Sequence, residues 1–183
     1  SDGQSLQGEL LRRGIIANGH EAIPCHFKES LQKTFYLKNL KPDVVYGIGF
    51  WGNVPEIVKE PQRYGLKAVP WFNADGWVAN YQEEFGKLDL MFTTSKWVRD
   101  VYERDNVDVS KIIPMHIGID TDLFKPKGTP EEKAAIKEML GLKKDEKMIL
   151  TIGGDVTSKG AQEMIKALAE VDKEYQNWKY VCK

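Results

Sequence analysis

Two glycines and a lysine late in the chain have the residue types and spacing of a phosphate-binding turn. Met148–Ile152 is a short apolar run typical of a buried strand, Gly153-Gly154 ends it, and Lys159-Gly160 opens the next segment. A strand that passes through a glycine turn into a helix presents free N–H groups and a positive dipole end, which favour an anion. Because a lysine opposes the dipole in a first helical turn, its presence indicates an anionic partner. The alternative is a solvated lysine beside an ordinary turn.

The elements around this turn are indicated by apolar spacing and by capping residues. Apolar residues recur at helical spacing over Ala161–Glu174, so one stripe of that helix can pack against a sheet. Thr129–Glu132 has threonine at N-cap, proline at N1 and glutamate at N3, which predicts a capping box and a helix over Pro130–Leu140. That helix is expected to act as a spacer. A second strand is predicted over Lys179–Cys182.

The first two thirds of the chain alternates between predicted helices and strands. The predicted helices span Leu6–Ala17, Ile57–Tyr64 and Lys96–Arg104, and the predicted strands span Ala22–Phe27, Lys41–Tyr46, Leu66–Phe72 and Leu88–Phe92. Pro24 places the first of these strands at an edge or a bulge. This alternation predicts an α/β protein with a Rossmann-like, mostly parallel sheet and helices on both faces.

Polar and aromatic side chains follow the predicted strands of this first region. Asn73 and Asp75 lie in the loop after Leu66–Phe72, and loops at the carboxyl ends of parallel strands line the ligand crevice. Asp75-Gly76 is also an ordinary turn sequence. The nearby aromatic residues form a set that suits a sugar ring or, alternatively, simple core packing: Trp51, Phe72, Trp77 and Tyr81.

Composition excludes several classes of protein. The formal net charge is −1, so we expect no broad attraction to nucleic acid or to an anionic membrane. Cys25 and Cys182 lie far apart without metal-type spacing, and we expect both to be buried thiols in a reducing compartment. We expect no secretory signal and no membrane-spanning helix, because no apolar run reaches about 18 residues.

The segment from Lys111 to Pro126 carries a family resemblance. Its matching residues are Ile113, Pro114, Gly118, Ile119, Asp120, Phe124 and Pro126. They resemble the "I-P-x-G-[IV]-D-x-x-x-F-x-P" linker between the two Rossmann-like halves of retaining GT-B glycosyltransferases, especially glycosyltransferase family 4. In that family a strand, a glycine turn and a Lys-Gly helix start follow the linker. The resemblance covers Leu10 to Trp178.

The resemblance implies an organisation and an activity. Residues 1–126 would form the acceptor-side domain, 127–146 a linker and spacer helix, and 147–183 the start of the donor-side domain, so a GT-B half-domain precedes the beginning of the second half. The implied enzyme is a hexosyltransferase of polysaccharide biosynthesis. It moves a sugar, with retention, from a UDP- or GDP-sugar donor to a glycan, lipid-linked or small-molecule acceptor. No cofactor and no metal are implied.

The resemblance also implies site residues. The donor phosphates would be held by Gly3, Gly118, Gly153, Gly154, Lys159 and Gly160. The catalytic candidates are Asn73, Asp75 and His116, the last being in the hinge near the cleft, where local backbone bonding is the alternative role. Family members usually have arginine at the position of Gly154, so backbone N–H groups would have to replace a charged donor fork.

Other functions and locations remain open at this stage. The family's first strand and its Glu-x7-Glu segment are missing, so we expect a fragment that is inactive alone. A non-catalytic module that binds sugar nucleotide or a partner chain is one alternative, and a nucleotide-sugar epimerase of the same fold is another. We expect a cytoplasmic location. Leu31–Leu40 is interpreted as a packed surface helix, with weak peripheral contact at the inner membrane face as the alternative.

Overall fold

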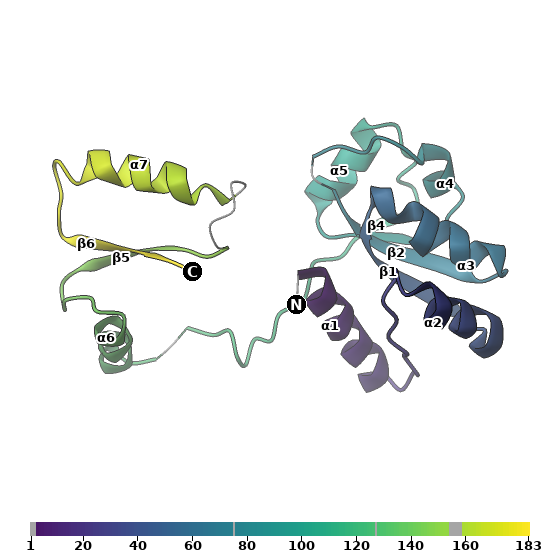
Figure 1. Ribbon diagram of the computed structural model, residues 1–183, viewed down its shortest axis with the longest axis horizontal. Coiled ribbons are helices and arrows are strands. Elements are labelled where there is room, and N and C mark those ends of the chain that lie inside the picture. Colours follow the sequence, from purple (N-terminus) through teal and green to yellow (C-terminus); the bar gives the residue numbers. More distant parts are fainter. Residues whose placement is uncertain (1–2, 75, 127, 154–158) are drawn as a thin grey trace. The chain divides into compact units, whose positions relative to one another are not determined.

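The computed structural model describes residues 3–74, 76–126, 128–153 and 159–183. The chain divides into two compact units, residues 1–119 and residues 120–183, whose elements are labelled in Figure 1. Each unit contains its own parallel sheet, with the strand order β1-β2-β3-β4 in the first and β5-β6 in the second. The structure therefore confirms the predicted α/β fold class.

The first unit is built on a four-stranded sheet. Its strands are β1 (Val44–Phe50), β2 (Lys67–Asn73), β3 (Met91–Thr93) and β4 (Ile112–Pro114). Its helices are α1 (Gly3–Ala17), α2 (Ser30–Phe35), α3 (Glu60–Arg63), α4 (Gln82–Gly86) and α5 (Lys96–Arg104), with a 3-10 turn η2 (Trp51–Asn53) and π-helical segments η1 (Tyr36–Leu40) and η3 (Pro55–Lys59). All strand pairs are parallel, so their carboxyl ends share one edge.

Helices cover both faces of this sheet, and glycines in β1 explain how closely one of them approaches. A Cβ atom at Gly47 would lie 1.8 Å from Ile57 Cγ2 of η3, and one at Gly49 would lie 3.0 Å from Ile57 Cδ1. Ile48 points to the opposite face because side chains alternate along a strand, and there it meets Gly8 of α1. The strand sequence Gly-Ile-Gly therefore admits η3 on one face while α1 packs on the other.

The main core lies on the η3, α4 and α5 side of the sheet. Phe85 is 3% exposed and packs edge-on against both Phe72 and Tyr102, with ring centroids 6.2 and 5.2 Å apart. The Tyr102 hydroxyl donates to the Asn73 carbonyl over 3.4 Å, and burial raises the pKa of Tyr102. Burial of one such aromatic side chain contributes about 1.5–3 kcal/mol. This core fixes β2 and the loop that follows it.

The helical segment formed by η3 and α3 begins as a π-helix, and a proline in the sequence explains why. Residues Pro55–Lys59 are π-helical and continue directly into α3, which contains Pro61. Proline has no N–H to donate and its ring crowds the carbonyl of the preceding turn, so regular α-helical bonding cannot continue through Pro61. The predicted helix over Ile57–Tyr64 thus exists with different bounds and a different helical type.

Three sequence-based expectations about strands and cysteines are wrong. Ala22–Phe27 is a loop rather than a strand, because Pro24 lacks a donor and no described strand pairs with the segment, which leaves Ile23 49% exposed. Cys25 lies in this loop and is exposed, not buried, and Cys182 is also exposed, at the end of a strand. Conversely, Ile112–Pro114 was assigned to the linker, yet it forms β4.

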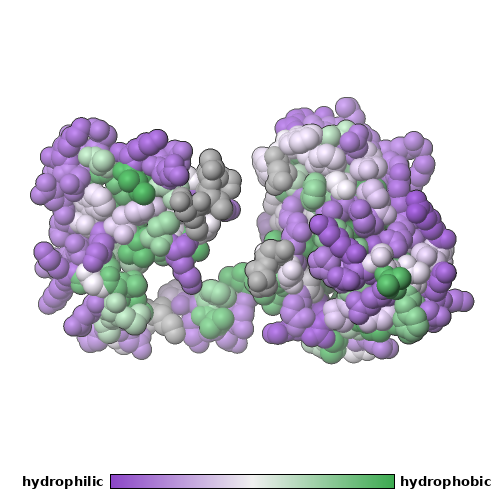
Figure 2. All heavy atoms as spheres, in the orientation of Figure 1, coloured by the Kyte–Doolittle hydropathy of each residue, from purple (hydrophilic) through white to green (hydrophobic). Residues whose placement is uncertain are grey.

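The second unit is smaller and has a sparse core. It contains α6 (Pro130–Met139), β5 (Lys147–Thr151), α7 (Ala161–Val171) and β6 (Trp178–Cys182). The predicted capping box is present: Thr129 Oγ1 accepts from the Glu132 N–H over 3.3 Å, and the Thr129 N–H donates to Glu132 Oε2 over 3.2 Å. The exposed fractions are 79% for Met139 and 69% for Ile152, and Figure 2 shows hydrophobic residues at the surface.

Among the described residues, none of the helices has the length and apolar character needed to cross a bilayer.

Candidate functional site

The carboxyl edge of the four-stranded sheet gathers part of the predicted catalytic set. Asn73 is the last residue of β2, and its side-chain amide has no hydrogen-bond partner among the described residues. His116 follows the end of β4 by two residues and is exposed. The two residues therefore belong to one edge, two strands apart in the sheet order. Asp75 lies outside the described residues.

The loop after β2 is anchored by a pair of charged residues at the end of α5. Asp105 accepts a hydrogen bond from the Val78 N–H over 2.6 Å, and Arg104 donates to the Gly76 carbonyl over 2.6 Å. Arg104 also pairs with Asp105, at 2.8 Å between Nε and Oδ1. The Arg104 hydrogen bond holds the pKa of Asp105 below its usual value, and the Val78 N–H lowers it further. The loop segment that carries Trp77 is thus fixed on both sides.

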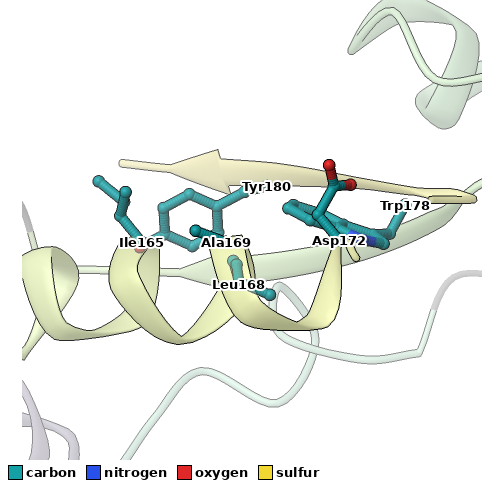
Figure 3. Close-up of a pocket in the computed structure, with 6 residues that line it drawn as sticks. All are labelled: Ile165, Leu168, Ala169, Asp172, Trp178 and Tyr180. Carbon is teal, nitrogen blue, oxygen red and sulfur yellow. The ribbon is translucent and has the colours of Figure 1, made fainter. Parts of the chain in front are cut away.

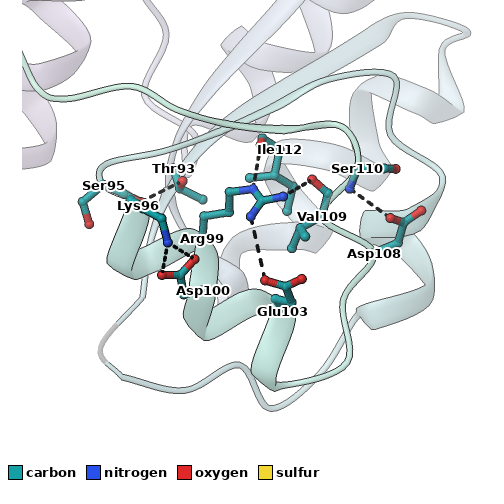
Figure 4. Close-up of polar contacts among 10 residues, drawn as sticks. All are labelled: Thr93, Ser95, Lys96, Arg99, Asp100, Glu103, Asp108, Val109, Ser110 and Ile112. Atoms are coloured by element: carbon teal, nitrogen blue, oxygen red, sulfur yellow. Dashed lines mark hydrogen bonds and ion pairs between the residues drawn. The ribbon is translucent and has the colours of Figure 1, made fainter.

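A second network ties α5 to β4, so that the third and fourth strand ends keep their positions. Ser95 caps α5 by accepting from the Val98 N–H over 3.2 Å. Arg99 donates to the carbonyls of Ile112 and Val109 over 3.2 and 3.3 Å, as Figure 4 shows. Because its donors are used on backbone carbonyls, Arg99 is a structural residue. The predicted helix Lys96–Arg104 is confirmed with the same bounds.

Two buried polar groups in this unit were missed by sequence reasoning. Glu56, in the first turn of η3 after β1, has a buried Oε2 without a hydrogen-bond partner among the described residues. Gln7 of α1 is 1% exposed, and both of its amide atoms lack partners in the same described part of the chain. Such groups cost free energy and call for an explanation. From the sequence alone, Glu56 has the pattern of an acidic residue in a first helical turn, and Gln7 has the pattern of an exposed helical residue.

Gly118 and Gly3, both predicted to hold donor phosphate, lie in the first unit. Gly118 lines a mainly apolar pocket of 420 Å³ between α1 and the sheet, whose other lining residues are Leu10, Leu11, Gly14, Ile15, Asn18, His20, Trp71 and Met115. The Trp71 indole N–H is satisfied by the Met115 carbonyl at 3.1 Å. Gly3 begins α1, with open space around its Cβ position. Their phosphate role stays a prediction.

The second unit brings the remaining described residues of the predicted phosphate site together. Gly153 has φ 141°, and a Cβ atom there would lie 2.9 Å from Lys159 Cγ, so the lysine's aliphatic chain runs across this glycine. Gly160, at φ 68°, is the N-cap of α7 and provides no side-chain cap for its N–H groups. The Gly153 N–H donates to the Lys183 carbonyl over 2.8 Å. Gly154 lies outside the described residues.

This arrangement has the chemistry of an anion site. The φ of 141° at Gly153 belongs to a region that L side chains rarely adopt, so glycine is needed there, and the left-handed φ of 68° at Gly160 favours glycine. Backbone N–H groups at the start of the 11-residue helix α7 lie next to an exposed lysine side chain. Free N–H groups and a full positive charge together stabilise a phosphate.

The second unit also contains a cavity, and its lining differs in chemistry from the anion site at the start of α7. It measures 320 Å³ and lies between α7 and β6, as Figure 3 shows, lined by Ile165, Leu168, Ala169, Asp172, Trp178 and Tyr180. The Trp178 indole N–H is satisfied by the Tyr175 carbonyl at 2.7 Å, whereas the buried Tyr180 hydroxyl has no partner among the described residues. With one carboxylate and otherwise apolar walls, the cavity does not suit a phosphate.

No metal centre is formed by the part of the chain that the structure describes: it contains no group of three or more histidine, cysteine, aspartate or glutamate side chains placed to hold an ion. The chain does contain an Asp-x-Asp sequence, Asp120-Thr121-Asp122. Asp120 Oδ1 accepts from the N–H groups of Asp122 and Leu123 over 2.9 and 3.0 Å. This carboxylate therefore stabilises a turn, and metal independence stays a prediction.

Comparisons with known proteins concern the fold. No family model matches this chain, and no curated protein is significantly similar to it in sequence. The crystal structure of Anabaena Alr3699/HepE in complex with UDP and glucose is similar with a TM-score of 0.67 and 11% identity, over 99% of this chain and 57% of that one. HepE in complex with UDP matches with a TM-score of 0.59 and 11% identity, over 84% and 50%. This chain thus spans little more than half the length of that protein.

Proposed function

We propose that this chain belongs to a retaining GT-B glycosyltransferase of the family 4 type, and that it contributes the acceptor-side domain and the first part of the donor-side domain. The observation that carries the proposal is the grouping of Gly153, Lys159 and Gly160 at the start of α7. Its support is the fold shared with a protein solved with UDP and glucose, which are the two parts of a sugar nucleotide.

Each part of the site has a role in the proposed reaction. Lys159 and the N–H groups at Gly160 and the start of α7 stabilise the negative charge that develops on the departing nucleoside diphosphate, which is electrostatic leaving-group catalysis. Asn73 and His116, at the carboxyl edge of the other sheet, orient the acceptor hydroxyl. The donor is a UDP- or GDP-sugar, the acceptor a glycan, a lipid-linked sugar or a small molecule in polysaccharide biosynthesis, and no cofactor takes part.

A titration of the full-length protein with UDP and GDP tests the donor site. Lys159→Ala is expected to weaken nucleotide binding tenfold or more, equivalent to about 1.4 kcal/mol. Lys166→Ala is the matched control, because Lys166 is an exposed lysine later in the same helix. Equal effects of the two substitutions would show that Lys159 acts through general charge, and would remove the support for a phosphate site at this turn.

A non-catalytic module that binds sugar nucleotide is a second candidate, because Gly154 stands where the resembled family has arginine. Incubating the full-length protein with nucleoside-diphosphate sugars and a panel of glycan acceptors separates the candidates. Transfer to an acceptor supports the glycosyltransferase. Epimerised or hydrolysed donor without transfer favours the epimerase, and binding without any turnover favours the module.

Peripheral membrane contact, for a protein located in the cytoplasm, is proposed for the surface of α2. Leu31 is 88% exposed and Phe35 is 56% exposed, whereas Leu37 is buried. Lys33 cannot serve lipid phosphates, since it pairs with Glu60 and donates to the Phe27 carbonyl over 2.6 Å. Co-sedimentation with vesicles should therefore depend on Leu31 and Phe35, and replacement of both by serine should abolish it. Retention of binding by that double variant would reject α2 as the contact.

A further inference from the structure

Three of the chain's five tryptophans meet at the carboxyl edge of the first sheet. Trp51 lies in η2 after β1, Trp77 in the loop after β2, and Trp97 in the first turn of α5 after β3. The Trp51 and Trp77 ring centroids are 5.1 Å apart at an interplanar angle of 59°. The Cβ position of Gly76, next to Trp77, lies 4.0 Å from Trp97 Cη2. We call these three residues the tryptophan platform.

Core packing accounts for Trp51, which packs against the buried cluster, but not for the other two members of the platform. Trp77 is 54% exposed and Trp97 is 60% exposed, although the residues around them in the chain, Val78 and Val98, are 4% and 5% exposed. Trp71, by contrast, is 5% exposed, and its indole N–H is satisfied by a backbone carbonyl. Two large aromatic rings left in water, both close to Gly76 in the loop after β2, indicate a surface that is covered when a ligand binds.

The backbone that presents Trp77 is held in place before any ligand arrives. Hydrogen bonds fix the residues on both sides of it: Arg104 to the Gly76 carbonyl, and the Val78 N–H to Asp105. Gln82 adds a bond to the Val78 carbonyl over 3.2 Å. A preorganised aromatic surface loses little conformational entropy on binding, so its apolar area contributes more fully to affinity.

The described charged side chains that flank the platform are paired, and this points to an uncharged ligand. Arg104 is paired with Asp105, and Lys96, the residue before Trp97, is paired with Asp100 at 2.7 Å. The side-chain amide of Asn73, which ends β2 at this edge and has no partner among the described residues, can exchange hydrogen bonds with hydroxyl groups. An electron-rich ring face attracts the partly positive C–H groups on the apolar side of a pyranose.

We infer that the tryptophan platform binds a neutral glycan chain, with pyranose rings stacked on Trp77 and Trp97 and Trp51 supporting Trp77 from behind. This inference rests on the proposed function, and it selects a glycan as the acceptor class. The angle between Trp51 and Trp77 makes Trp51 a wall rather than a second coplanar surface. An aromatic surface whose neighbouring charges are paired suits neutral hydroxylated rings better than it suits a charged lipid headgroup.

The test is a titration of the full-length protein with neutral malto-, cello- and manno-oligosaccharides of increasing length, without nucleotide, followed by tryptophan fluorescence and calorimetry. At least one series should bind, with affinity rising with chain length. Trp77→Ala and Trp97→Ala should each weaken binding tenfold or more, while Trp77→Tyr retains most of it. Tyr64→Ala is the control, since Tyr64 is 36% exposed and lies shortly before the start of β2, at the opposite edge.

Several outcomes would overturn the inference. It fails if no oligosaccharide series binds, or if the alanine variants bind as the wild type does while circular dichroism shows a folded protein. It also fails if phosphatidylcholine vesicles, rather than oligosaccharides, protect Trp77 and Trp97 from a fluorescence quencher. Because no nucleotide is present, such a failure leaves the UDP and GDP titration of Lys159→Ala as an independent test of the proposed function.

Discussion

The two candidate sites differ in the chemical groups that they present. The edge of the four-stranded sheet presents aromatic rings and neutral polar groups on loops that Arg104 and Asp105 anchor to a dense core. The start of α7, with Lys159 and the N-cap Gly160 before it, presents backbone N–H groups and one lysine in a unit whose apolar side chains are largely exposed. The first site is rigid before binding because of side-chain packing. The second is shaped by glycine backbone geometry, so it can function with few buried residues.

The largest effect on the free energy of unfolding should come from a substitution in the core of the first unit. Phe85→Ala removes a ring packed between Phe72 and Tyr102, and is expected to cost about 3–5 kcal/mol of unfolding free energy. Ile165→Ala, on α7, removes a side chain that is 56% exposed, and should cost less than about 1 kcal/mol. Urea unfolding of both variants measures the difference, and equal losses would contradict the claim that packing is concentrated in the first unit.

Two glycine substitutions, one on each face of β1, should have opposite effects on stability. Gly47→Ala would place a methyl group 1.8 Å from Ile57 Cγ2, and this overpacking should cost about 1–3 kcal/mol. Gly8→Ala, in the interior of α1, meets Ile48 at an ordinary 3.8 Å and should stabilise the protein by up to about 1 kcal/mol through helix propensity. Thermal unfolding of the pair gives the signs. A stabilising Gly47→Ala would refute the packing described for β1.

Within the second unit, local capping should matter more than its sparse core. Thr129→Ala removes the acceptor for the Glu132 N–H and leaves the start of α6 uncapped, at an expected cost of about 1 kcal/mol. Amide hydrogen exchange of α6 reports the change locally, with Thr121→Ala, at an exposed threonine outside the capping box, as the comparison. Unchanged exchange in α6 would mean that the capping box does not stabilise this helix in solution.

The smallest expected effect is a pH dependence of the anchored loop. The folded-state pKa of Asp105 is lowered by Arg104 and by the Val78 N–H, so its stabilising contribution is present above the ordinary aspartate pKa and is lost as pH falls through the folded-state value. Wild type should therefore exceed Asp105→Asn in stability at neutral pH, and the gap should close below about pH 4. A gap that stays constant with pH would show that the charge of Asp105 does not matter.

Sequence patterns predicted the regular parts of the fold because local rules act there without competition. The bounds of α5 and the capping box of α6 follow from side-chain spacing and from capping residues alone. The predicted strand at Ala22–Phe27 failed because a strand needs a partner that periodicity does not report. β4 was missed since three residues ending in Pro114 are too few to show a period.

The candidate sites were predictable only where a motif brings the residues together in sequence. Gly153, Lys159 and Gly160 are close in the chain, and one strand-turn-helix unit places them. Trp97 was not predicted as a site residue because it lies inside a helical pattern. Its proximity to Gly76 arises from the parallel sheet, which brings the two segments to one edge. Glu56 has the sequence pattern of a charge at a helix start, and the burial of its oxygen in η3 is a tertiary feature that this pattern does not report.

The most direct test of the account is one binding experiment on the full-length protein: a calorimetric titration with UDP and with GDP of wild type, Lys159→Ala and Trp77→Ala. We predict that at least one nucleotide binds, that Lys159→Ala weakens its binding tenfold or more, and that Trp77→Ala leaves its binding unchanged, because the proposed nucleotide site is at Lys159 and the start of α7. Absence of binding to both nucleotides, or equal affinity in wild type and Lys159→Ala, would contradict the proposal that this turn holds the diphosphate of a sugar donor.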